Sequence, residues 1–241
     1  MSLKTYRAKR NFAITAEPAG KIKSIIKKIV SPKKQLKFVV QKHNASHLHY
    51  DFRLEMQGVL KSWAVPKGPS LDPSIKRLAV EVEDHPLEYG NFEGIIPENQ
   101  YGAGIVMLWD RGYWQAQEPG AVAGYKKGHI AIELFGEKLK GKWALVKIKS
   151  NKMAGTKNPW LLMKLQDKYA KVDYDILAKK PRSVISKRTT TQIGMDPKSK
   201  KYGKNKTSST KPIKKKSNSK QYKKTKTPSA KSTKKKTITT R

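Results

Sequence analysis

Residues 41–55 read QKHNASHLHYDFRLE, and the second half of this stretch alternates between polar and apolar side chains. If residues 50–54 are extended, a period of two places His49, Asp51 and Arg53 on one face and the three apolar side chains among them on the other. Burying charged groups without partners is costly. The first face therefore predicts a chemical role, and the second predicts a place in the core.

The polar face is suited to a metal ion beside a phosphate. His49 and Asp51 offer an imidazole and a carboxylate to a divalent cation, and His43 can reach the same ion from the preceding turn. Arg53 offers a planar fork that matches phosphate oxygens. His47 shares the ligand face by parity, but three protein ligands already suffice for an open catalytic site. We therefore interpret His47 as a flanking residue.

A second alternating segment, residues 78–84, leads directly to His85. Strand ends are places where a scaffold can hold a reactive side chain at the rim of a cavity. Alone, a histidine before a proline is more often a turn residue. Because several titratable groups that converge mark a site, we predict that His85 joins the cluster.

The composition favours a polyanionic partner, because 53 Lys and Arg against 18 Asp and Glu give a formal net charge of +35. The absence of cysteine excludes disulfides and thiolate metal sites. The sequence contains neither an apolar run of membrane-spanning length nor the apolar core of a signal peptide near its start. We expect a soluble, cytoplasmic, nucleoid-associated protein without a membrane partner.

The charge pattern divides the chain into three parts. Residues 1–35 form a basic N-terminal arm with a helical apolar pattern, which suits an arm packed on the domain better than a membrane surface. Residues 36–178 look globular. Residues 179–241 form a Lys-, Ser- and Thr-rich tail that predicts disorder and salt-sensitive, sequence-independent binding of nucleic acid. The apolar pattern of the arm consists of Ile22, Ile25, Ile26 and Ile29.

The globular part is predicted to be mainly β. Short strand-like runs recur between turn signals, and about eight of them at this spacing favour a small, closed or nearly closed antiparallel β-barrel. The predicted strands are residues 37–40, 50–54, 62–65, 78–83, 105–109, 129–134, 143–148 and 160–165.

Several ordered motifs occur together in this part. They read FVVQKHNAS at 38–46, LHYDFRLE at 48–55, GVLKSWAVPKGPS at 58–70, EDHPLEY at 83–89, FEGIIP at 92–97, YGAG at 101–104, GKWALV at 141–146 and WLLMK at 160–164. Over about residues 36–170 the sequence closely resembles the 3′-phosphoesterase domain of bacterial DNA ligase D. The family fold is a small β-barrel, which agrees with the predicted strands.

The resemblance implies a manganese-dependent enzyme of DNA end repair, with Co²⁺ or Zn²⁺ as alternative metals. Members of the family remove a 3′-phosphate to leave a 3′-hydroxyl. They also trim a 3′-terminal ribonucleotide, so that polymerase and ligase can complete non-homologous end joining. The implied partners are DNA with such 3′ ends and, since the chain contains no ligase K-x-D-G motif, a separate ligase, polymerase and end-binding protein. We expect a stand-alone version of the domain.

The resemblance also assigns roles to residues of this sequence. The family's metal ligands fall on His43, His49 and Asp51. Its catalytic residues fall on Arg53 and His85, which form the phosphate-contacting pair, and on Tyr89, which matches a further active-site tyrosine. Supporting substrate-binding positions fall on Lys67, Arg77, Glu83, Arg10 and Glu17.

The N-terminal arm departs from the family pattern at one position. The family usually has Arg-Asp-Phe before Thr-x-Glu-Pro, whereas this chain has Arg10-Asn11-Phe12 before residues 15–18. Because the arm contributes to ribonucleotide trimming in the family, the neutral Asn11 makes that activity less secure than phosphate removal.

Two other functions compete with this hypothesis. In a non-haem iron oxygenase, His49 and Asp51 with a distal His85 or His129 would form a facial triad, but Arg53 would have no role. A non-enzymatic DNA-binding protein would explain the charge but not the intact polar cluster. A pure binder would survive the loss of Asp51, whereas a metalloenzyme would not.

Overall fold

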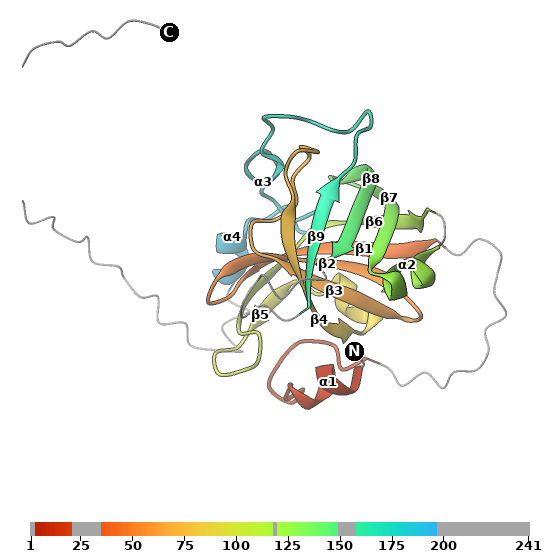
Figure 1. The fold of residues 1–241 in the computed structure, drawn as a ribbon. Coiled ribbons are helices and arrows are strands. Elements are labelled where there is room, and N and C mark those ends of the chain that lie inside the picture. The colour runs from red at the N-terminus through yellow and green to blue at the C-terminus, as the bar shows by residue number, and fades with distance from the viewer. Residues whose placement is uncertain (1–2, 21–34, 118–119, 149–157, 197–241) are drawn as a thin grey trace, which may run out of the picture. The chain divides into compact units, whose positions relative to one another are not determined.

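The computed structural model describes residues 3–20, 35–117, 120–148 and 158–196, and its centre is a closed antiparallel barrel (Figure 1). The barrel strands are β1 (Leu36–Asn44), β2 (Leu48–Met56), β3 (Val59–Val65), β4 (Arg77–His85), β9 (Pro159–Lys164), β8 (Lys140–Lys147), β7 (His129–Gly136) and β6 (Gly104–Ala116), in their order around the barrel. Pairing of β1 with β6 closes the ring, and the short β5 (Gly94–Ile96) pairs with β6.

Alternation along the strands fills the barrel with large apolar side chains. Tyr50, Phe52 and Leu54 of β2 are buried in the main core, as the sequence predicts, together with Phe38 and Val40 of β1. All five tryptophans of the chain are also buried; they are Trp63, Trp109, Trp114, Trp143 and Trp160. Because the apolar faces point inward, the odd-numbered polar residues of β1 and β2 lie on the outer face.

The predicted fold class is confirmed. Each of the eight predicted strands corresponds to one strand of the barrel, although most observed strands are longer. The prediction missed β5 and the helix α2 (Ala121–Lys127), which precedes β7.

The predicted start of the tail at residue 179 is wrong. After α3 (Ile176–Lys179), the chain continues along the barrel to α4 (Thr190–Gly194). Val184 donates its backbone N–H to the carbonyl of Leu108 at 2.9 Å, and Ile193 is buried in the main core. These contacts hold residues 180–196 against β6. The remainder of the predicted tail lies outside the described residues.

The N-terminal arm is packed on the barrel through α1 (Leu3–Ala8). Tyr6 is fully buried and joins a second apolar cluster with Tyr89 and Phe92, near the 3₁₀ helix η1 (Leu87–Asn91). The predicted helix around Ile22–Ile29 lies outside the described residues.

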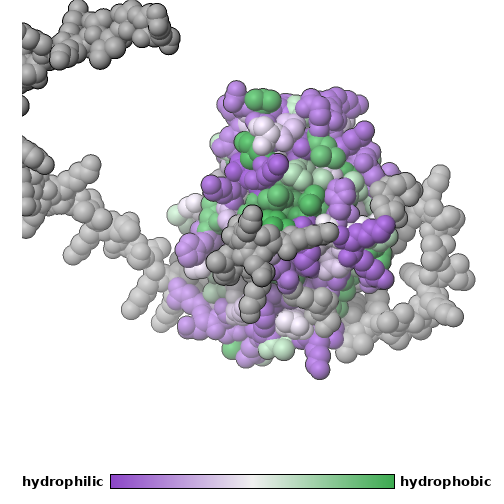
Figure 2. All heavy atoms as spheres, viewed as in Figure 1, coloured by the Kyte–Doolittle hydropathy of each residue, from purple (hydrophilic) through white to green (hydrophobic). Residues whose placement is uncertain are grey.

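The described part of the surface is largely hydrophilic in the view of Figure 2, with a group of apolar residues near its centre. No helix within the described ranges is long and apolar enough to cross a membrane.

Candidate metal and phosphate site

Three candidate metal ligands come together on the outer face of β1 and β2. The antiparallel register pairs His43 directly with His49, and Asp51 follows two residues later on the same face. His43 Nδ1 lies 3.7 Å from Asp51 Oδ2, and His49 Nε2 lies 3.6 Å from Asp51 Oδ1. Ligands about 2.1 Å from a common ion have separations of this size. All three ligand atoms lie within 4.8 Å of one another.

Backbone carbonyls orient both histidine rings. The Nε2 atom of His43 lies 2.9 Å from the carbonyl of Gly102, and Nδ1 of His49 lies 2.9 Å from the carbonyl of His47. A carbonyl only accepts, so these two nitrogens carry the ring protons. The opposite nitrogens, which face Asp51, therefore present lone pairs. Fixing of the outer ring nitrogen by a hydrogen-bond acceptor is characteristic of metal-ligating histidines, and the donor set fits a divalent cation.

Asp51 is ionised at neutral pH despite being buried. Burial alone would raise its pKa, but the adjacent Arg53 guanidinium outweighs this effect and holds the pKa of Asp51 well below its usual range. The Nη2 atom of Arg53 donates to Asp51 Oδ2 at 2.9 Å. The carboxylate is thus held in its metal-binding form.

Arg53 is itself only 2% exposed and is held by three strands. Besides Asp51 on β2, it donates through Nε to Gln41 Oε1 on β1 and through Nη1 to Ser62 Oγ on β3, each at 2.8 Å. A guanidinium has five N–H donors. Three are used in these bonds, and a fourth, on Nη1, faces Nδ1 of His85 at 2.9 Å. The second N–H of Nη2 remains available to an anion.

His85, at the end of β4, lies against Arg53. Its Nδ1 atom is 2.9 Å from the carbonyl of Glu83 and 2.9 Å from Arg53 Nη1. On the other side of the ring, Nε2 lies 3.4 Å from Arg10 Nη2. Burial, together with the positive charges of Arg53 and Arg10, lowers the pKa of His85 well below its usual range. The imidazole is therefore neutral here.

Tyr89 completes the inner wall of the site. Its ring centre lies 4.7 Å from that of His85 and 4.9 Å from the Arg53 guanidinium carbon. Burial raises the pKa of Tyr89 well above its usual range, so its hydroxyl stays protonated. The cation–π contact is another restraint on the guanidinium.

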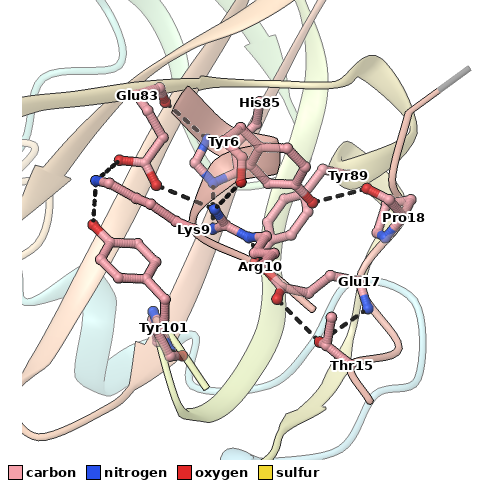
Figure 3. A network of polar contacts seen from close by, with 12 residues as sticks. Tyr6, Lys9, Arg10, Thr15, Glu17, Pro18, Glu83, His85, Tyr89 and Tyr101 are labelled. Atoms are coloured by element: carbon pink, nitrogen blue, oxygen red, sulfur yellow. Dashed lines mark hydrogen bonds and ion pairs between the residues drawn. The ribbon is translucent and has the colours of Figure 1, made fainter. Parts of the chain in front are cut away.

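The arm adds two cations to the same site, as Figure 3 shows. Arg10 forms ion pairs with Glu17 of the arm at 2.8 Å and with Glu83 of β4 at 3.3 Å, and it stacks over Tyr6. Lys9 forms an ion pair with the same Glu83 at 3.1 Å. The two acids therefore position Arg10 beside His85.

These groups surround an open cavity of about 280 Å³. Most predicted site residues line it: Arg10, His43, His49, Asp51, Arg53, Glu83, His85 and Tyr89. Glu17 contributes indirectly through Arg10. Lys67 and Arg77 instead line a different cavity of about 420 Å³ beside α3. The structure therefore does not bring these two residues to the metal ligands.

Sequence reasoning missed several residues that shape the site. Gln41 could have been identified, because it shares the parity of His43 on β1. Besides binding Arg53, its amide donates to the carbonyls of Tyr89 and Phe92 at 3.0 and 2.9 Å. Other contributions had no signal in the local pattern, because they depend on the closed barrel and the docked arm. They come from Lys9, Ser62, Tyr101 and Gly102.

Comparison with known proteins gives this arrangement a family. Residues 41–147 match the family model described as the DNA Ligase D 3′-phosphoesterase domain. The chain contains a domain of the DNA ligase D 3′-phosphoesterase family. The matched segment includes the three candidate ligands as well as Arg53, His85 and Tyr89, and the predicted resemblance is thereby confirmed.

Relatives of this 3′-phosphoesterase domain occur within much larger proteins. The chain is 49% identical over 193 residues, or 78% of its length, to the multifunctional non-homologous end joining protein LigD of Pseudomonas aeruginosa. It is 40% identical over 170 residues, or 68% of its length, to the protein of that name from Mycolicibacterium smegmatis. The matches cover 21% of each of these two relatives, so the chain spans about a fifth of their length.

Proposed function

We propose that the protein is a metal-dependent phosphoesterase that removes a 3′-phosphate from DNA ends during non-homologous end joining. The observation that carries the proposal is the convergence of His43, His49 and Asp51 beside the buried fork of Arg53. The family match and the names of the relatives support DNA ends as the substrate. We take Mn²⁺ as the metal because the family resemblance implies it; Co²⁺ and Zn²⁺ are alternatives, since imidazole and carboxylate ligands also suit them.

The chain's own residues divide the chemistry between them. A bound divalent cation would supply Lewis acidity and a water of lowered pKa. Arg53 offers its remaining Nη2 N–H to a phosphate oxygen, and its positive charge balances negative charge that develops on the phosphoryl group. His85 is neutral between two guanidinium groups, and a phosphate dianion would offset their charge. Its Nε2 atom can then take up a proton and hydrogen-bond an oxygen of the ester.

Phosphate release from a defined DNA end tests the proposal. The substrate is a 5′-labelled primer–template with a 3′-phosphate, incubated with the full chain and Mn²⁺. We expect conversion to the 3′-hydroxyl, and its loss in His49→Ala. His129→Ala is the matched control, because this exposed histidine is on β7 outside the site. No conversion with Mn²⁺, Co²⁺ or Zn²⁺ would contradict the proposal.

Measurements of metal binding, DNA affinity and phosphate release in single variants separate the two competing functions. An iron oxygenase that used His129 would lose metal binding in His129→Ala, and would need iron and a cosubstrate. A DNA-binding protein without enzymatic activity would retain its full affinity for DNA in Asp51→Ala and would release no phosphate. A phosphoesterase would instead keep its metal binding in His129→Ala. It would release phosphate, and its DNA affinity would fall in Asp51→Ala.

We also propose removal of a 3′-terminal ribonucleotide, supported by the position of the arm. Asn11 Oδ1 accepts the backbone N–H of Ala13 at 3.1 Å, which is a bond that an aspartate would also form. The turn that carries Arg10 towards His85 is therefore kept. We expect Asn11→Asp to cleave a 3′-ribonucleotide end within about threefold of the wild-type rate, less than a 1.4 kcal/mol change in barrier. Activity that exists only in Asn11→Asp would show that the carboxylate itself is needed.

A further inference from the structure

A row of four exposed side chains crosses the outside of the barrel away from the candidate active site. The antiparallel registers pair Lys37 of β1 with Tyr113 of β6, Tyr113 with Phe135 of β7, and Phe135 with Lys140 of β8. Strands in a sheet are about 4.8 Å apart, so the row is about 14 Å long. Two aromatic rings thus stand between two lysines on neighbouring strands.

The rings of this row point outward. Tyr113 precedes the buried Trp114, and Phe135 follows the buried Leu134. Tyr113 is 45% exposed and Phe135 is 40% exposed, and their ring centres lie 6.4 Å apart at an interplanar angle of 36°. Among the aromatic residues that the structure describes, they are the one exposed pair in ring contact. Each ring still presents an accessible surface.

The charge around the rings is suited to an anion. Lys37 and Lys140 are exposed, and neither forms an ion pair within the described ranges. Of the nearby acids, Glu55 is buried and accepts the backbone N–H of Lys37 at 3.1 Å. Glu137 forms an ion pair with Arg111 at 3.1 Å, and Glu133 lies directly opposite Lys142 in the register. The row therefore combines open aromatic surface with two exposed lysines that form no ion pair within the described ranges.

We infer that this row is a binding platform for single-stranded nucleic acid, with bases stacked on Tyr113 and Phe135 and phosphates near Lys37 and Lys140. Aromatic surfaces flanked by cations recognise unpaired strands, because every base has a face that can stack, whereas the bases of a duplex are already stacked. The opposite charges of the lysines and the phosphate backbone favour this occupant over a second copy of the chain, which is itself strongly basic.

The platform deepens the proposed function and rests on it for the source of the strand. Lys37 and His43 are both on β1, six residues apart and on the same outer face, which corresponds to about 20 Å. This is about six nucleotides at the 3.4 Å spacing of a stacked strand. An unpaired segment of about six nucleotides next to a DNA end in the site would therefore reach the rings.

Binding of two matched strands by the full chain tests this inference. One is a fluorescent oligothymidylate, and the other has the same length and phosphates but abasic sugars. In Tyr113→Thr combined with Phe135→Thr, which keeps strand-forming residues, we expect about tenfold weaker binding of the oligothymidylate, within the range measured for stacked bases. Binding of the abasic strand should not change.

The control is the exchange variant Tyr113→Phe with Phe135→Tyr, which preserves both rings and should bind like the wild type. Lys37→Gln and Lys140→Gln should each lower the slope of log affinity against log salt by about 0.7. Unchanged affinity in the threonine variant, or equal weakening for both strands, would overturn the platform. A dimer in sedimentation that dissociates in the threonine variant, with oligothymidylate affinity unchanged, would assign the row to a second copy instead.

None of these measurements uses phosphate release. Normal phosphate release with no effect of the ring substitutions would remove the platform and leave the proposed activity in place. Ring-dependent strand binding without phosphate release would contradict the proposed activity and leave the platform in place.

Discussion

Arg53 carries bonds to side chains of three barrel strands. Replacement by lysine keeps the charge but removes the planar fork, leaving Gln41 Oε1 and Ser62 Oγ without their donor. We expect Arg53→Lys to lower phosphate release roughly a hundredfold, the size of effect seen when one transition-state donor is lost. It should also lower the free energy of unfolding by about 1–3 kcal/mol, because buried acceptors lose their partners.

Arg111→Lys is the control for this substitution. Arg111 also pairs with a carboxylate, but its side chain is 48% exposed. Exposed ion pairs contribute little, so its effect on unfolding should stay within about 0.5 kcal/mol. Near-normal turnover of Arg53→Lys would argue against recognition of phosphate by the fork.

The neutral state of His85 predicts a loss of stability in acid. Its pKa is lowered in the folded protein, so below the ordinary value of about 6.5 the unfolded chain gains a proton that the folded chain does not. Above that pH, His85 is neutral in both states and does not change the free energy of unfolding. It destabilises the fold by up to about 1.4 kcal/mol for each pH unit below it, until the folded pKa is reached.

Urea unfolding of wild type and His85→Gln between pH 7 and pH 5 measures this effect. The free energy of unfolding of the variant should fall less steeply with decreasing pH, whatever its value at pH 7. Parallel pH profiles would mean that His85 binds its proton equally in both states.

The strand pattern was enough to group most of the candidate site residues, but two of the predicted supporting residues, Lys67 and Arg77, lie away from the metal ligands. Parity placed His49, Asp51 and Arg53 together because it depends only on the local backbone. Arg77 begins β4 and His85 ends it, so their backbones are about 26 Å apart along an extended strand. Motif order alone does not say which end of a strand meets the site.

At the scale of elements, predictability followed length and apolar content. The eight barrel strands carry alternating or continuous apolar residues, whereas β5 has only three residues. The segment through α4 is rich in Ser, Thr, Lys and Arg, and its buried anchors are chiefly Val184 and Ile193. Two isolated apolar residues hardly change the average composition of a segment. The sequence therefore predicted disorder where the chain packs on the barrel.

Gly104, the first residue of β6, connects the barrel closure to the metal ligands. Its φ is +142°, and a Cβ there would lie 2.4 Å from the carbonyl oxygen of Asn44, next to His43. Gly104→Ala should therefore displace β1 from β6 and move Gly102, whose carbonyl orients His43. We expect about tenfold weaker Mn²⁺ binding, or about 1.4 kcal/mol, by calorimetry.

Gly58→Ala is the matched control, since Gly58 also has a positive φ, +80°, but nothing lies within 4 Å of its added Cβ. It should cost about 1 kcal/mol in backbone strain and leave Mn²⁺ affinity unchanged. Equal metal affinities in the two variants would contradict a link between the closure and the ligands.

At the scale of the whole molecule, residues 180–196 and 197–241 are predicted to respond differently to truncation. The latter contain 18 basic residues and no acidic residue. Removing them should lower DNA affinity, reduce its salt dependence and leave phosphate release unchanged. Truncation after Lys179 also removes Val184 and Ile193, which are 5% and 2% exposed. It should therefore lower the free energy of unfolding by roughly 3 kcal/mol or more.

Salt titrations of DNA binding and urea unfolding of both truncations separate the two effects. Equal salt slopes with and without residues 197–241 would show that those lysines do not contact phosphates. Equal unfolding of the two truncations would show that α4 contributes nothing to the barrel.

The pairing of β1 with both β2 and β6 also has a consequence for self-association. A closed ring leaves no long strand edge to which another chain can add. The edge strand that the described residues do present is β5, with the sequence Gly-Ile-Ile. A three-residue edge is a poor template for intermolecular sheets. Aggregation by strand addition should therefore require the barrel to open first, and should follow the same denaturant midpoint as unfolding.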